Sequence, residues 1–162
     1  MWYLLLRGGA KAAWVKPGLG DLRSALLAFP GLLGIGFLVS LMGTLFPGLP
    51  APPGMEAPQG LVPWLVLIIA SLGTGYLEET YFRAYLYTRF TEAGLGPLRS
   101  AAVSAALFTL CHLYEGPWGA LNALLAGLFL SLVFLRRKSL HGLAWAHGGY
   151  NVFAYLLSAA GA

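Results

Sequence analysis

The chain has 162 residues, of which 58% are hydrophobic and only 10% are charged, and its formal net charge is +4. Soluble domains carry roughly 25% charged residues, so this composition excludes a soluble or disordered chain and predicts an integral membrane protein of one domain. Its basic residues are dispersed at the ends of apolar runs and build no patch, which argues against nucleic acid as a partner. The single cysteine, Cys111, excludes an internal disulfide and a cysteine-based zinc site.

The N-terminal residues 1–21 mix cations with tryptophan, tyrosine and leucine, which is typical of a segment lying on a membrane surface. The remainder, 22–162, is predicted to be a membrane-embedded domain. A proline-rich loop precedes the second apolar run, and turns with glycine or proline or a basic triplet separate the others. We therefore predict an all-α, polytopic transmembrane bundle of about five spans, preceded by the interfacial segment. The expected spans are 22–46, 61–90, 98–112, 118–135 and 139–157.

The loop cations predict an orientation. They lie before the first span, between the second and third spans, and after the fourth span. The two other connecting loops hold only Glu56 and Glu115 as charged residues. Because cytoplasmic loops of membrane proteins are enriched in lysine and arginine, this pattern places the N-terminus in the cytoplasm and the C-terminus outside.

Three charges interrupt the second span at Glu78, Glu79 and Arg83. Each costs roughly 2.5–3.5 kcal/mol at a bilayer centre unless it faces the protein interior. Glu79 and Arg83 are four residues apart, so they share a helix face and are expected to form an ion pair. Glu78 points about 100° away around the helix axis. An intramembrane carboxylate without such a partner indicates a functional site.

Two further polar pairs lie in other spans, and both have i,i+4 spacing. Phe108 and His112 end the third span, and His147 and Asn151 lie in the fifth. A rise of 1.5 Å per residue puts Glu78 ~18 Å from the inner end of its span. The same rise puts His112 ~22 Å, and His147 with Asn151 ~10–16 Å, from their inner ends. These depths allow the three helices to bring their polar residues together near the middle of the membrane.

These residue types suit hydrolysis of an amide bond. A glutamate in a pocket can act as general base on water, with a histidine orienting that water or taking part in proton transfer. A second histidine and an asparagine amide can donate hydrogen bonds to an oxyanion. A competing interpretation makes Glu78, His112 and His147 the ligands of a catalytic zinc. There is no His-Glu-x-x-His motif, so that metal rests on ligand type alone.

The three motifs, in this order and helical context, resemble those of the CPBP intramembrane protease family. This family includes the type II CAAX prenyl endopeptidases and the bacterial Abi, or bacteriocin-immunity, proteins. The resemblance spans about residues 61–157. It implies that Glu78 and His112 activate water and that His147 and Asn151 bind the oxyanion. It also implies that Glu79 and Arg83 have supporting roles. Phe108 is expected to pack beside His112 and shape the pocket.

The resemblance also leads to expectations about cofactor, substrate and location. The family has been labelled metalloprotease, yet a glutamate-driven mechanism without metal is argued for it as well, and we favour no cofactor, with zinc as the alternative. Small size and the spread of the family favour a prokaryotic cytoplasmic membrane. The expected partners are the lipid bilayer and a membrane-associated peptide or protein substrate. Larger family members have more helices before the first motif, so a second copy of the chain could complete the substrate wall.

Two other functional classes stay open at this point. One is a non-proteolytic bacteriocin-immunity or membrane scaffold protein with the same fold, which would keep its binding when Glu78 is changed to glutamine. The other is a small transporter or proton relay, because intramembrane glutamate and histidine are also usual there. Transport requires a continuous polar pathway, and the outer halves of the second and fourth spans are apolar.

Overall fold

The computed structural model describes residues 16–50, 52 and 54–161, and within this part of the chain every regular element is a helix. The all-α prediction is confirmed, and each of the five expected apolar runs corresponds to a helical segment. Of the predicted interfacial segment, residues 1–15 lie outside the described part. In chain order the elements are α2 (Leu19–Leu45), α3 (Leu61–Glu78), η2 (Glu79–Leu86), α4 (Tyr87–Glu92), α5 (Pro97–Leu110), η3 (Leu113–Glu115), α6 (Gly116–Arg137) and α7 (Leu140–Gly161).

The helix ends follow the turn residues of the sequence. Pro97 and Pro117 lie in the first turns of α5 and α6, where a missing N–H costs no intrahelical hydrogen bond. Lys138 ends α6 in the left-handed conformation, with a φ of 52°. Pro30 lies inside α2, which continues through it as one helix.

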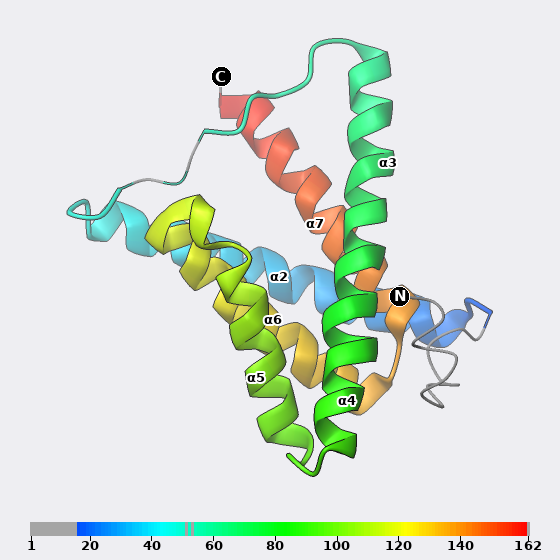
Figure 1. The fold of residues 1–162 in the computed structure, drawn as a ribbon. Coiled ribbons are helices and arrows are strands. Elements are labelled where there is room, and N and C mark those ends of the chain that lie inside the picture. The colour runs from blue at the N-terminus through cyan, green and yellow to red at the C-terminus, as the bar shows by residue number, and fades with distance from the viewer. Residues whose placement is uncertain (1–15, 51, 53, 162) are drawn as a thin grey trace.

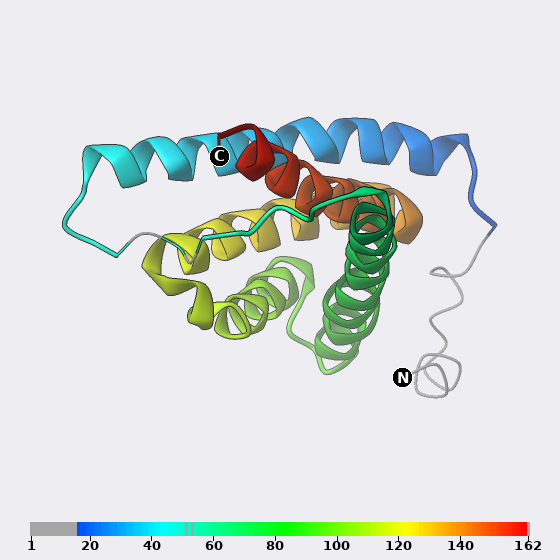
Figure 2. The same ribbon diagram turned by 90° about the horizontal axis from the view of Figure 1, so that it is seen from above.

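The helices pack around α7 and α6, and α2 contacts both of these (Figure 1). α7 contacts both α2 and α3, and α6 contacts both α5 and α2. Seen from above, α2 runs along one side of the molecule, and α3 stands across its direction (Figure 2). The segment from α3 to α4 is continuous and passes α7 on one side and α5 on the other. This segment carries the three intramembrane charges, so its packing decides which residues they meet.

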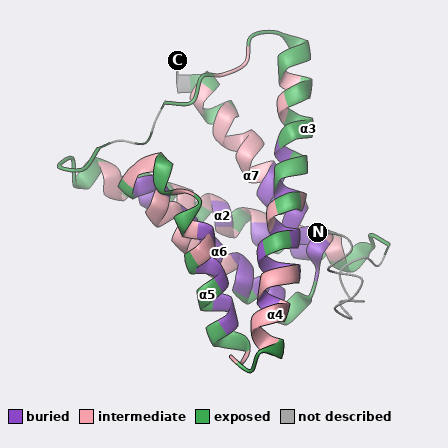
Figure 3. Cartoon of the chain, viewed as in Figure 1, coloured by how far each residue is buried: buried purple, intermediate pink, exposed green. Residues whose placement is uncertain are grey.

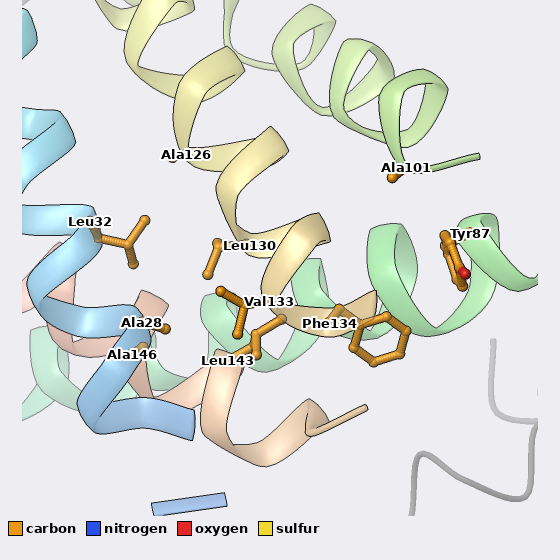
Figure 4. Packing of buried hydrophobic residues seen from close by; sticks show 10 residues of the cluster. All are labelled: Ala28, Leu32, Tyr87, Ala101, Ala126, Leu130, Val133, Phe134, Leu143 and Ala146. Carbon is orange, nitrogen blue, oxygen red and sulfur yellow. The ribbon is translucent and has the colours of Figure 1, made fainter. Parts of the chain in front are cut away.

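The largest hydrophobic cluster is built mainly from small and branched side chains of α2, α6 and α7 (Figure 4). Leu130 and Leu143 are fully buried at its centre, beside Ala28 and Leu32 of α2. Burial is concentrated where the helices cross, whereas the first half of α3 is largely exposed (Figure 3). Such an exposed face made of leucine, valine and isoleucine suits contact with lipid chains.

Three helices in the described part of the chain are long and apolar enough to cross a membrane: Leu19–Leu45, Leu61–Glu92 and Leu113–Arg137. α5 is also apolar but has only 14 residues. α7 has 22 residues and contains His147 and Asn151. These helices make the protein an integral membrane protein, as the composition predicted.

One local feature was not predicted. The second span is not α-helical throughout, because residues Glu79–Leu86 form a π-helix between α3 and α4. The Tyr87 N–H donates to the carbonyl oxygen of Phe82, five residues earlier. The Ser104 hydroxyl of α5 donates to the same oxygen at 2.6 Å. π-helical turns are rare and are often found at functional sites.

Candidate active site

The centre of the site is a buried carboxylate, Glu79, at the start of η2. Its side chain is fully buried, and its Oε1 atom lies 3.1 Å from Nη1 of Arg83, which is 1% exposed. The expected i,i+4 ion pair therefore forms. The same Oε1 atom accepts a hydrogen bond of 2.8 Å from Nδ1 of His147 on α7. Two charged groups at this depth need such mutual compensation, because burial without a partner is costly.

Arg83 also joins η2 to the neighbouring helices. Its Nη2 atom donates to the carbonyl oxygen of Gly127 on α6 at 3.3 Å. Its guanidinium carbon lies 4.7 Å from the ring centroid of Phe108 on α5, which is a cation–π distance. One side chain thus contacts η2, α5 and α6. The Gly127 contact was not expected, because the partner is a main-chain atom, which sequence spacing cannot identify.

Glu78 lies next to this ion pair but faces a different set of groups. Its Oε1 atom is 3.9 Å from Nε2 of His112, and its Oε2 atom is 3.5 Å from Nε2 of His147. The carboxylate is 18% exposed, whereas that of Glu79 is fully buried. The end of α3, the turn after α5 and α7 therefore bring together the accessible carboxylate of Glu78 and the imidazoles of His112 and His147. The depths along the spans allowed such a meeting of Glu78, His112 and His147.

The hydrogen bonds of the two histidines fix which ring nitrogen faces Glu78. His112 Nδ1 lies 2.8 Å from the carbonyl oxygen of Phe108, and a carbonyl can only accept, so Nδ1 carries the proton. His147 Nδ1 likewise donates a hydrogen bond to the carboxylate of Glu79. Both rings consequently turn Nε2 toward Glu78. The ring of Phe108 packs against that of His112, with centroids 4.3 Å apart, and so holds it in place.

Two further residues lie close to the histidines in the sequence: Asn151, which was predicted to bind the oxyanion, and Tyr114. Asn151 lies one turn after His147 on α7 and is half-buried, but it forms no hydrogen bond with another described residue. Tyr114, in η3, was not singled out. Its ring stacks on that of His112 with centroids 6.3 Å apart, and it is 76% exposed. Position beside His112 was the available signal, but a turn residue gives no periodicity to interpret.

The fit of these residues to a metal ion can be judged from their spacing. Glu78 presents one carboxylate oxygen to His112 and the other to His147, and His147 Nδ1 is already engaged by Glu79. In the described part of the chain, no group of three or more histidine, cysteine, aspartate or glutamate side chains is spaced to hold a metal ion. This spacing gives no positive support for a bound zinc ion, whereas the hydrogen bonds of the two Nδ1 atoms are compatible with one, because a metal-bound histidine also keeps its other nitrogen bonded.

The fold and site define a class: a polytopic helical membrane protein with a glutamate and two histidines at a helix crossing. A family model described as type II CAAX prenyl endopeptidase Rce1-like matches residues 60–153. This range is more than half of the chain and contains the residues of all three motifs. The chain therefore belongs to this protease family, and the resemblance identified from the sequence is confirmed. No curated protein and no solved structure matches it.

Proposed function

We propose that this protein is an intramembrane endopeptidase in which Glu78 and His112 activate water for attack on a peptide bond. The observation that carries the proposal is the 3.9 Å gap between Glu78 Oε1 and His112 Nε2. This separation is too long for a direct hydrogen bond and suits a water bridging the two atoms. Because both groups are acceptors in this arrangement, one water can donate a proton to each.

The reaction then follows from the charges. Glu78 takes a proton from the water as its oxygen bonds to the scissile carbonyl carbon, and the carbonyl oxygen becomes negative. His147, when both ring nitrogens carry protons, donates from Nε2 to this oxygen, with the Asn151 amide as second donor. Collapse of the intermediate breaks the carbon–nitrogen bond, and Glu78 returns its proton to the leaving amine.

Glu79 and Arg83 have a supporting role in this proposal. The 2.8 Å bond from His147 to Glu79 orients the imidazole, as the carboxylate does in a serine protease triad. Arg83 compensates the charge of Glu79 and ties it to α5 and α6. Glu79, which positions His147, is therefore distinct from Glu78, which exchanges protons, although the two residues are adjacent in sequence.

The proposed setting is a prokaryotic cytoplasmic membrane with the N-terminus inside. The turns between α4 and α5 and between α6 and α7, which lie beside the basic residues, are toward the lower edge of Figure 1. The C-terminus and the loop before α3 lie at the opposite edge. In such a membrane the substrate class is a membrane-associated peptide or a single-span protein. No step of the proposed reaction uses a metal ion.

The test is cleavage of a fluorogenic membrane-peptide library by purified wild type, Glu78→Gln and His112→Ala, each with and without a chelator. We expect cleavage by the wild type that the chelator does not affect. Removing a general base lowers kcat about 10²–10⁴-fold, so both variants should be nearly inactive. Chelator-sensitive cleavage would instead support the zinc mechanism. Absence of wild-type cleavage on every substrate would favour a binding protein with this fold.

A further inference from the structure

The helices α3 and α7 approach each other closely at Gly75 and Gly148. A methyl group built on Gly75 would lie 2.6 Å from the carbonyl oxygen of Ala144 and 2.9 Å from the backbone nitrogen of Gly148. A methyl group on Gly148 would lie 2.9 Å from the Cα atom of Leu72. The obstructing atoms belong to backbone, which cannot rotate away as a side chain can. At this crossing the two backbones are therefore in direct contact.

This close contact lies beside the site. Gly75 is one turn before Glu79 on the same continuous helix, and Gly148 directly follows His147 on α7. The hydrogen bond between Glu79 Oε1 and His147 Nδ1, at 2.8 Å, bridges the same two helices. Both side chains are buried, so neither has much freedom to compensate for a shift of its helix. The separation of the helices at Gly75 thus sets the length of this bond.

We propose that Gly75, together with Gly148, is a positioning residue that sets the distance between Glu79 and His147; its role in catalysis rests on the proposed function. Real Cβ atoms essentially never come within 3.0 Å of such neighbours. An alanine at position 75 therefore forces the helices apart by about 0.4 Å or more, because overpacking is relieved by backbone shifts. This shift lengthens the 2.8 Å bond to about 3.2 Å, the limit of a normal hydrogen bond.

Catalysis responds strongly to such displacements. Active-site groups must be held within about 0.5 Å of their productive positions, and a misplacement of 1 Å can lower the rate about 10²-fold. We expect Gly75→Ala to lower kcat about tenfold and to change KM little, because the substitution displaces the groups that act on the bound substrate and alters no exposed side chain. Gly148→Ala meets its nearest backbone atoms at 2.9 Å and requires a smaller shift, so we expect about a threefold loss.

The chain offers two matched controls. Gly73 precedes Gly75 by two residues on α3 and is exposed, and a methyl group there meets nothing within 4 Å. Gly73→Ala adds the same helix propensity as Gly75→Ala without the clash and should leave kcat unchanged. Gly142 lies at another tight contact of α7, against Asp21 and Ser24 of α2. Gly142→Ala should lower the thermal stability but leave the kcat of the folded protein unchanged, which separates positioning from stability.

A spectroscopic readout tests the inference without relying on activity. The chain has three histidines, so ¹⁵N labelling of histidine gives three imidazoles to follow by NMR. We expect Gly75→Ala to shift the Nδ1 signal of His147, because its bond to Glu79 lengthens. The Nδ1 signal of His112 serves as the reference, because it bonds to Phe108 within its own segment. Gly73→Ala should leave both signals in place.

The inference is wrong if Gly75→Ala keeps its kcat within twofold of Gly73→Ala, or if the His147 signal does not move. Should Gly75→Ala fail to fold, Gly148→Ala takes its place with the same two readouts. If the wild type cleaves no peptide, the proposed function fails, but the NMR comparison still decides whether the crossing sets the Glu79–His147 bond. The two failures are therefore distinguishable.

Discussion

Two polar clusters lie along α7, and they differ in how completely their groups are engaged. At the start of the helix, the Ser139 hydroxyl donates to Asp21 of α2 at 2.6 Å and accepts the Gly142 N–H at 3.2 Å. Beside it, the Tyr76 hydroxyl and His141 Nδ1 are 3.0 Å apart. We call these residues the Asp21 cluster. Two turns further along, the Glu78 site consists of Glu78, Glu79, Arg83, His112 and His147.

Along α7, the hydrogen bonds that hold the helix in place and the groups that are available for chemistry lie at different positions. The hydrogen bonds of the Asp21 cluster are short, direct and local to helix ends. In the Glu78 site Glu79, Arg83 and the Nδ1 atoms of both histidines are engaged in this way, whereas Glu78 stays 3.5–3.9 Å from its two neighbours. A group that is already fully hydrogen-bonded has no capacity to bind water or substrate. We therefore expect changes in the Asp21 cluster to affect stability alone, and changes in the Glu78 site to affect activity as well.

The largest effect is expected for Arg83→Met. The substitution leaves the charge of Glu79 buried without compensation, and breaking a buried ion pair in this way costs about 3–5 kcal/mol. The free energy of unfolding, measured by denaturant titration in detergent micelles, should fall by this amount, and peptidase activity should be lost. Arg99→Met, on the exposed surface of α5, is the control and should change stability by less than about 0.5 kcal/mol. Equal effects of the two variants would contradict the assignment of Arg83 to the buried site.

Ser139→Ala tests the Asp21 cluster. Ser139 directly precedes α7 and accepts an N–H of its first turn, so its loss should lower the unfolding free energy by about 0.5–2 kcal/mol. The kcat of the folded protein should not change, because no atom of the Glu78 site is touched. Unfolding measurements and cleavage kinetics on the same preparation provide the check. A large fall in kcat at full folding would show that the two clusters are not independent.

Ser104→Ala tests whether the π-helix supports the site. The variant removes the 2.6 Å hydrogen bond to the Phe82 carbonyl, a net contribution of about 0.5–1.5 kcal/mol. We expect a fall in kcat that exceeds the change in stability, because the turn that orients Glu79 and Arg83 loses its contact with α5. Ser100→Ala is the matched control, since Ser100 is equally buried on α5 but bonds to Thr91. If both variants behave alike, the Ser104 contact has no special role.

The smallest effect is expected for Tyr76→Phe. It removes one hydroxyl of the Asp21 cluster, and its bond to His141 lies in a partly buried position. A loss of about 0.5 kcal/mol in unfolding free energy, with unchanged kcat, is the expected result. Tyr76 lies two residues before Glu78, so this variant is the strictest test of the comparison. Loss of activity here would mean that the hydroxyl contributes to the Glu78 site.

The sequence by itself determined the features that depend on spacing along one helix. Apolar runs of sufficient length predicted the helical segments, because backbone groups in a membrane must be satisfied within a helix. The ion pair of Glu79 with Arg83 and the contact of Phe108 with His112 followed from i,i+4 spacing. The three motifs identified the protease family, and the match over residues 60–153 agrees.

Only the tertiary structure decided how the helices meet. Which glutamate bonds to His147 depends on the separation of α3 and α7, and this separation is set by backbone contact at Gly75. The π-helix and the Gly127 contact of Arg83 depend on backbone groups, whose positions no residue spacing reveals. Spacing along a helix is fixed by covalent geometry, whereas contacts between helices result from packing of residues far apart in the chain.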